Sequence, residues 1–178
     1  CMIGHVQEMI DAGIDSFKIE GRMKTALYVA TVARTYRKAI DDYMKDPKLY
    51  EANMEWYKEE IGKCTYREFT TGFYFGKPGS DAQIYNSNTY VKNYTYLGTV
   101  EEADGKGRCR IEQKNKFSVG ETIEIMKPDG RNLEVVVKSI CDEDGNGQES
   151  APHPKQILWV DLGADVDKYD ILRKKEDN

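Results

Sequence analysis

The stretch that decides the N-terminal fold reads Ile14-Asp15-Ser16-Phe17-Lys18-Ile19-Glu20-Gly21-Arg22-Met23-Lys24. Its pattern predicts a short strand over residues 15–19 that stops at Gly21 and turns directly into a helix. In such a strand Phe17 and Ile19 point to one face and the charged side chains between them to the other, because successive strand residues alternate.

Three charged side chains, those of Lys18, Glu20 and Arg22, gather where this strand gives way to the helix. In parallel α/β proteins, ligands bind at that end of the strands. Arg is suited to gripping a carboxylate with two hydrogen bonds, and Glu20 can fix Arg22 or act as a base, so the three residues are candidates for holding an anionic small molecule. The alternative, which we weigh equally, is a set of salt bridges that closes one end of a barrel.

Helices are predicted on both sides of this stretch. Residues 3–12 place apolar side chains three and four apart, and Gly13 is suited to end that helix. A second helix is predicted from about Met23 to Met44, and a third restarts at Pro47, with Asp46 as its cap, and runs to Gly62. The apolar stripe of the second helix consists of Val29, Val32, Ala33, Tyr36, Ile40 and Tyr43.

From Tyr66 onward, short β-rich runs replace the helical spacing. Glycine-containing turns separate the runs, and a further strand is possible near Phe73, which together predict an antiparallel barrel. Cys109 alternates with two arginines and is expected in its core. The aromatic segment Phe69 to Phe75 is expected to pack against the barrel, with stacking on nucleic-acid bases as the alternative. The six runs span residues 94–102, 107–113, 121–126, 133–141, 156–161 and 169–173.

Composition limits the possible functions. The chain has 178 residues and a net charge of −5, which gives no bulk electrostatic support for nucleic-acid binding, although a local basic patch is compatible with it. No apolar run is long enough to suggest a membrane span, and no signal peptide is visible. The four cysteines form no Cys-x-x-Cys pair, so we expect reduced thiols in a cytoplasmic protein rather than a zinc site. Because residue 1 is Cys, we expect the chain to begin inside a longer one.

Four segments resemble one known family. They read Asp15-Ser16-Phe17-Lys18-Ile19-Glu20-Gly21-Arg22-Met23-Lys24, Tyr28-Val29-Ala30, Tyr36-Arg37-Lys38-Ala39-Ile40 and Phe69-Thr70-Thr71-Gly72-Phe73-Tyr74-Phe75-Gly76. Over roughly the first 80 residues they closely resemble the collagenase-like peptidase family U-32. The remainder is similar, more loosely, to the C-terminal extension of that family.

The resemblance implies an α+β chain with two parts. Residues 1–65 would be the helical tail end of a TIM-like catalytic domain, with the one short strand, and residues 66–178 a C-terminal antiparallel β-barrel. The partner would be the upstream part of the TIM-like domain. Without it the exposed strand edge over residues 15–19 is expected to pair with a second copy, dock on the barrel or lose its regular structure, and we favour self-association.

The resemblance also implies chemistry. Some relatives carry a peptidase name with collagen-like substrates, and others hydroxylate tRNA or rRNA bases or a quinone precursor with an iron–sulfur cluster and prephenate. Cys1 resembles one ligand of that four-thiolate cluster, whose other ligands would lie upstream, so no cluster or metal is expected in this chain alone. Lys18, Glu20 and Arg22 are the catalytic candidates of the full-length protein.

The residues themselves offer no protease machinery. The two histidines, His5 and His153, lie near no signature for a Ser or Cys nucleophile, and His-x-x-x-His pairs and Gly-rich phosphate loops are absent. We therefore favour RNA hydroxylation for the full-length protein and a substrate- or RNA-binding role for the barrel. The alternative is a true collagen or peptide hydrolase.

Overall fold

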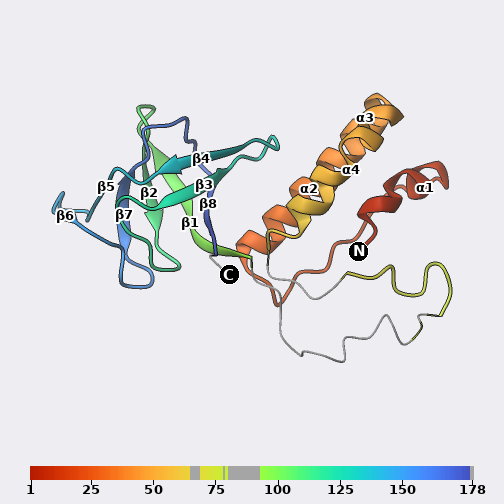
Figure 1. The fold of residues 1–178 in the computed structure, drawn as a ribbon, viewed down its shortest axis with the longest axis horizontal. Helices are drawn as coiled ribbons and strands as arrows, with labels where there is room; N and C mark the ends of the chain where they lie inside the picture. The colour runs from red at the N-terminus through yellow and green to blue at the C-terminus, as the bar shows by residue number, and fades with distance from the viewer. Residues whose placement is uncertain (65–68, 78, 80–92, 177–178) are drawn as a thin grey trace. The chain divides into compact units, whose positions relative to one another are not determined.

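The computed structural model describes residues 1–64, 69–77, 79 and 93–176. Contacts divide the chain into two compact units, Cys1–Asn93 and Tyr94–Asn178. Figure 1 shows helices in the first unit and strands in the second, as the α+β prediction requires. The predicted boundary between residues 65 and 66 falls on residues 65–68, which lie outside the described residues.

The first unit is helical, and the start of α3 is the one that the sequence predicts, whereas α2 begins at Ala26 rather than near Met23. The Thr25 hydroxyl accepts a hydrogen bond from the Tyr28 N–H at the start of α2, and the Asp46 carboxylate accepts one from the Lys48 N–H at the start of α3. The predicted third helix is in fact two, because the backbone leaves helical geometry at Asn53. The elements are η1 (Ile3–His5), α1 (Val6–Asp11), α2 (Ala26–Lys45), α3 (Pro47–Ala52) and α4 (Met54–Ile61).

The buried face of α2 differs from the predicted apolar stripe. Of that stripe only Val32 is fully buried, whereas Val29 is 47% exposed. The buried face instead carries polar side chains such as Arg34 and Asp42, which find partners on α4 and on the residue before it. Periodicity locates apolar residues, but it does not show that a charged side chain has a buried partner.

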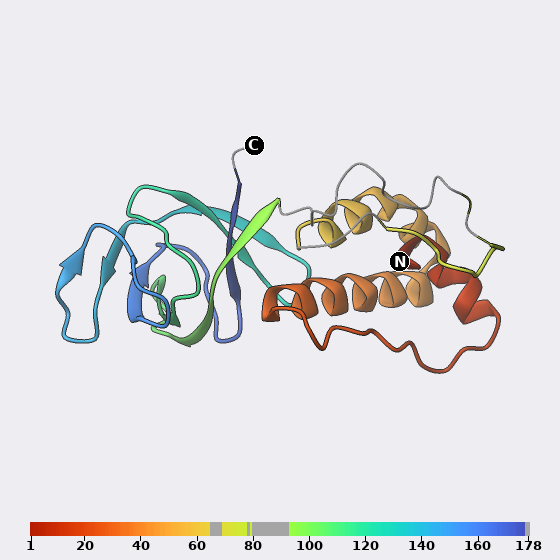
Figure 2. The ribbon, with the colours of Figure 1, turned by 90° about the horizontal axis from the view of Figure 1, so that it is seen from below.

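The predicted strand over residues 15–19 is wrong. Residues 14–21 are extended but pair with no strand. The Ile14 N–H donates to the Met9 carbonyl, and the Gly21 carbonyl accepts from the Lys24 N–H. Within the described part of the chain, the backbone groups of residues 14–21 make no other hydrogen bond to a backbone group. A strand needs a neighbour to bond with, and none of the described residues supplies one. Figure 2 shows this segment running along α2. Loss of regular structure was one of the three expected outcomes, and pairing between copies stays a prediction.

The second unit is an eight-stranded antiparallel sheet in the order β4-β3-β8-β1-β2-β7-β5-β6. Its core is formed by inward-facing aliphatic side chains that alternate along the strands, including Leu97, Ile111, Ile125, Leu158 and Leu172, together with Cys109 as predicted. The strands are β1 (Tyr94–Ala103), β2 (Arg108–Glu112), β3 (Thr122–Met126), β4 (Asn132–Val136), β5 (Ser139–Cys141), β6 (Gly147–Gln148), β7 (Ile157–Asp161) and β8 (Ile171–Lys175).

The sheet is curled into a barrel by a bend in one segment. The run over residues 133–141, predicted as a single strand, divides between β4 and β5 around Val137 and Lys138. The first half pairs with β3 and the second with β7, which stand far apart in the strand order. The bent segment therefore crosses the open side of the sheet, and the predicted β-barrel is confirmed.

The strand predicted near Phe73 is wrong. Residues 72–75 form turns, and Phe73, Tyr74 and Phe75 are 79%, 70% and 66% exposed. They therefore do not pack as a buried strand, and the expectation that they pack against the barrel stays a prediction. No helix in the described residues is long and apolar enough to cross a membrane.

Candidate functional site

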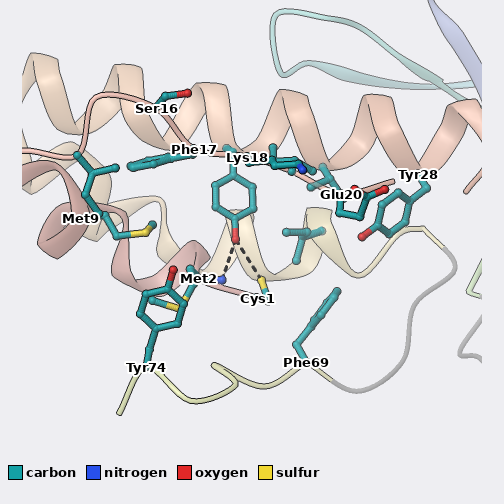
Figure 3. A pocket seen from close by; sticks show the side chains of 15 residues that line it. Cys1, Met2, Met9, Ser16, Phe17, Lys18, Glu20, Tyr28, Phe69 and Tyr74 are labelled. Carbon is teal, nitrogen blue, oxygen red and sulfur yellow. Dashed lines mark hydrogen bonds between the residues drawn. The ribbon is translucent and has the colours of Figure 1, made fainter. Parts of the chain in front are cut away.

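A hollow of about 500 Å³ lies in the first unit. It is bounded by the extended segment 14–20, by α2, by the first two residues and by the aromatic segment 69–75. Figure 3 shows Phe69 and Tyr74 on one side of it and Phe17, Lys18, Glu20 and Tyr28 on the other. A concave site of this size with few polar groups is typical of a site that binds a small molecule or one group of a larger ligand.

Five of the fifteen residues that line the hollow are aromatic. Phe17 belongs to the extended segment, Tyr28 and Tyr36 to α2, and Phe69 and Tyr74 to the aromatic segment. Segments distant in the sequence thus contribute rings to one space, because the extended segment lies along α2 and residues 69–74 lie opposite it.

Tyr36 is the polar centre of the hollow. Its hydroxyl accepts a hydrogen bond of 2.7 Å from the Met2 N–H and lies 3.6 Å from the Cys1 Sγ. Burial is the main cause that raises the pKa of Tyr36 above its usual value. The phenol therefore stays protonated at neutral pH and can donate a hydrogen bond to an acceptor in the hollow.

Two of the three predicted catalytic candidates line the hollow, and the third does not. Lys18 and Glu20 are lining residues, whereas Arg22 is not one of them. The Glu20 Oε1 accepts a hydrogen bond of 2.9 Å from the Arg22 backbone N–H, so Glu20 fixes the backbone of Arg22 rather than its guanidinium. No ion pair joins these three described side chains, which does not support the interpretation as a closing salt-bridge set.

The barrel carries a second, more open hollow of about 530 Å³. Tyr169 is 68% exposed there and adopts a φ of 77°, a strained conformation for a non-glycine residue. The Lys168 ammonium lies 5.1 Å from the centre of its ring, and Arg110 is held by Glu101 and Glu143. Most charges of this hollow are therefore already paired.

Family models match both units of the chain. The model described as peptidase family U32 matches residues 1–84, and the model described as the peptidase family U32 C-terminal domain matches residues 92–173. The chain belongs to peptidase family U32.

Relatives of this U32 chain carry two kinds of name. It is 37% identical over 97% of its length to "tRNA hydroxylation protein P1" of Bacillus subtilis, covering 41% of that protein, and 30% identical over 97% to "tRNA hydroxylation protein P" of Escherichia coli, covering 37%. It is 39% identical over 61% of its length to a "Collagenase" of Porphyromonas gingivalis, covering 28%. The chain thus spans about two fifths of the length of each of these two tRNA hydroxylation proteins.

The histidines of this U32 chain form no hydrolytic set. The His5 Nδ1 lies 3.0 Å from the Glu8 Oε1, and its ring lies against Phe75 at 4.6 Å between centroids. His153 is on the second unit, in a turn before β7. Neither lies beside a Ser or Cys nucleophile among the contacts of the described residues.

An iron–sulfur cluster does not fit the residues of this chain alone. Such a cluster needs four thiolates, and no group of three or more His, Cys, Asp or Glu side chains in the described residues can hold a metal ion. Cys1 lies at the hollow, whereas Cys64 is fully buried and donates a hydrogen bond to the Ile61 carbonyl. The cluster-ligand role of Cys1 stays a prediction that requires thiolates from outside the chain.

The sequence does not identify Tyr28 and Tyr36 as site residues, whereas Tyr74 belongs to the aromatic segment for which base stacking is the alternative prediction. The sequence pattern places Tyr36 in the apolar stripe of its helix and Tyr28 only in a segment that resembles the family. The available signal was weak: a tyrosine within an aliphatic stripe has a hydroxyl that needs a polar partner when it is buried.

Proposed function

We propose that this chain is the C-terminal part of a U32 protein that hydroxylates a base of tRNA. As the family resemblance implies, the complete protein would use an iron–sulfur cluster and prephenate as the source of the hydroxyl group. One observation carries the proposal: similarity to the tRNA hydroxylation proteins P1 of Bacillus subtilis and P of Escherichia coli runs through both units, over 97% of the chain, whereas similarity to a collagenase of Porphyromonas gingivalis covers 61%.

In this proposal the hollow is the chain's contribution to the active site. The Lys18 ammonium binds an anionic group, and the Glu20 carboxylate serves as an acceptor or base beside it. Arg22, which does not line the hollow, acts on a ligand only where the upstream domain extends the site. Cys1 supplies one thiolate to the cluster, next to the Tyr36 hydroxyl.

The barrel is proposed as an accessory module that binds the substrate. Support comes from its own core and its own family model, which indicate an independent unit. An exposed, strained Tyr169 beside Lys168 is a local feature suited to contact an RNA base or phosphate. A tRNA substrate would place the protein in the cytoplasm.

The test is complementation of a bacterial strain that lacks its own tRNA hydroxylation proteins. The strain receives the full-length reading frame that contains this chain, and nucleosides from its tRNA are analysed by mass spectrometry. We expect hydroxylated nucleosides to return with the unaltered protein and to fall at least tenfold with Lys18→Ala or Glu20→Gln. Matched changes on the exposed face of α3, Lys48→Ala and Glu51→Gln, should leave the level unchanged.

Absence of hydroxylated nucleosides with a soluble, full-length protein would refute the proposal. The second candidate, a peptidase, is favoured by the similarity to a collagenase. It predicts that the same purified protein cleaves gelatin and that His5→Ala or His153→Ala abolishes the cleavage.

A further inference from the structure

We propose that the hollow on the barrel binds one unpaired purine nucleotide of the substrate RNA, with the base on Tyr169 and its phosphate on Lys168. The inference rests on the proposed function, which supplies RNA as the ligand. The hollow of about 530 Å³ is lined by residues of β1, β2 and the turn before β8, so it lies within the second unit alone. Proteins that bind single-stranded RNA hold its bases against exposed aromatic rings.

The backbone of Tyr169 is strained in a way that the turn itself does not require. The Asp170 N–H donates to the Asp167 carbonyl at 3.1 Å, which closes a four-residue turn with Tyr169 in its third position. The φ of Tyr169 is 77°, a value that glycine adopts without strain and that a bulky side chain rarely adopts. Strained residues of this kind cluster at sites where ligands bind.

The turn holds the Tyr169 ring on a rigid support. The Tyr169 N–H donates to the Val100 carbonyl of β1 at 2.9 Å, and the Val100 N–H donates to the Asp170 carbonyl at 2.9 Å. Tyr169 is nevertheless 68% exposed, with the Lys168 ammonium 5.1 Å from its ring centre. The contact with Lys168 leaves most of the residue open, so the ring contributes little to the core and has surface left for a flat partner.

The charges of the hollow favour a ligand with a single phosphate. Two of its cations are already paired, Arg110 with Glu101 and Lys114 with Glu112. Lys168 takes part in no ion pair within the described part of the barrel, so its ammonium is available to a phosphate beside the ring. One available cation suits one nucleotide rather than a long stretch of phosphate backbone.

The remaining polar groups match the edge of a purine. The Tyr96 and Thr99 hydroxyl oxygens lie 2.8 Å apart and share one hydrogen, so the other hydroxyl hydrogen can be donated to a ring nitrogen or carbonyl. Glu102 also lines the hollow, and its carboxylate can accept from an amino group. Adenine and guanine carry amino groups, whereas uracil has none, and the larger purine face favours stacking on Tyr169.

The test is a nuclear magnetic resonance titration of the 178-residue chain with the 5′-monophosphates of guanosine, adenosine and uridine. We expect the two purine nucleotides to shift the backbone amides of Thr99, Lys168 and Tyr169 and to bind more tightly than the uridine nucleotide. Tyr169→Gly should weaken purine binding about 5- to 150-fold, because stacking of one base is worth about 1–3 kcal/mol. Tyr169→Phe keeps the ring and should bind as the unaltered chain does.

Tyr169→Gly also separates binding from folding. Because glycine adopts this φ without strain, the thermal unfolding midpoint of the variant should not fall. The matched control is Lys155→Gly, at another exposed residue of positive φ that does not line the hollow, and it should leave nucleotide binding unchanged. Lys168→Ala should weaken binding, whereas Lys106→Ala, which removes an exposed lysine that does not line the hollow, should not.

Four results would overturn the inference: no amide shifts at the hollow with millimolar nucleotide, equal affinity for uridine and purine nucleotides, undiminished binding by Tyr169→Gly, or a large fall in the unfolding midpoint of that variant. If one of these is found while the full-length protein restores hydroxylated nucleosides in the complementation assay, the inference fails and the proposed function stands. If purine nucleotides bind at the hollow but no hydroxylated nucleosides return, the proposed function fails, and the assignment of this site to a substrate RNA fails with it.

Discussion

Replacement of the buried Asp42 by alanine should destabilise the helical unit more than removal of any single charge on the exposed side of α2. Asp42 is 7% exposed, and its Oδ2 accepts hydrogen bonds from the Tyr57 hydroxyl at 2.6 Å and the Asn53 Nδ2 at 2.9 Å. The Lys38 ammonium pairs with the same carboxylate at 2.9 Å. One carboxylate therefore joins α2 to α4 and to the residue between α3 and α4.

The magnitude follows from these partners. A hydrogen bond to a charged acceptor is worth about 1.5–3 kcal/mol, and Tyr57, which is fully buried, would keep an unsatisfied hydroxyl. The bond from the half-buried Asn53 adds less, and the partly exposed Lys38 adds about 0–1 kcal/mol. We expect the free energy of unfolding to fall by about 3 kcal/mol.

The assay is urea denaturation of the 178-residue chain, followed by the fluorescence of Trp56. Trp56 packs edge-on against Tyr57, with 5.8 Å between ring centroids, so it reports this unit. A Trp159→Phe background removes the only other tryptophan, which lies in the barrel. With an m value of about 1–2 kcal/mol/M, the midpoint should fall by about 2 M.

The matched control is Asp41→Ala, the neighbouring carboxylate on the same helix. Its side chain is 62% exposed and pairs with Arg37 on the surface, so its removal should change stability by no more than about 0.5 kcal/mol. Equal midpoints for the Asp41 and Asp42 variants would show that the buried network contributes nothing and would refute the reasoning.

The same carboxylate gives a pH dependence. Burial alone would raise the pKa of Asp42, but the hydrogen bonds from Tyr57, Lys38 and Asn53 outweigh it and hold the pKa below its usual range. A lowered pKa stabilises the folded state above the unfolded pKa of about 3.9, and this stabilisation is lost as the pH falls through the lower folded value. The stability difference between the unaltered chain and Asp42→Asn should therefore shrink below about pH 4.

Three further predictions concern the barrel. Lys127→Ala should cost about 3–5 kcal/mol of barrel stability in urea denaturation, because its ammonium is 2% exposed and pairs with three carboxylates, one of them fully buried. Gly107→Ala should lower the thermal midpoint strongly, since its φ is +100° and a Cβ would lie 2.7 Å from a neighbouring backbone atom, whereas Gly105→Ala should lower it less, because its φ of +70° is strained for alanine but the space around it is open. Burial, reinforced by nearby carboxylates, raises the pKa of Cys109 to about 12, so a thiol reagent at pH 8 should label Cys141 in the folded chain and Cys109 only after denaturation.

Features set by neighbours in the sequence were predictable. The Asp46 cap and Pro47 at the first turn of α3 depend on a few adjacent residues, and the structure has both. The alternation of Cys109 with its neighbours likewise identified a buried position, because the two faces of a strand differ in exposure.

Features that depend on distant partners were not predictable. The strand over residues 15–19 is absent because a strand forms only where a neighbouring strand supplies hydrogen-bond partners. The sequence of the segment itself does not show whether such a neighbour exists. The sequence of α2 alone does not indicate that Asp42 is buried, because its partners lie on other elements. Of the candidate site, Lys18 and Glu20 were found from their local charge, whereas the rings that face them come from segments up to 56 residues away.

The distribution of charge separates what the two units can do for an RNA substrate. Residues 94–178 contain 13 Lys and Arg against 18 Asp and Glu, which accounts for the whole net charge of −5, while residues 1–93 contain 13 of each sign. Domains that anchor RNA through its phosphates are normally basic, because affinity grows with the number of neutralised phosphates. The barrel as a whole therefore repels a phosphate backbone, and any contact it makes must be local, at a site such as Tyr169 and Lys168. Under the proposed function, Lys168→Ala should then change the salt dependence of tRNA binding by one phosphate at most, and the larger electrostatic share would come from the first unit or from other parts of the proposed full-length protein.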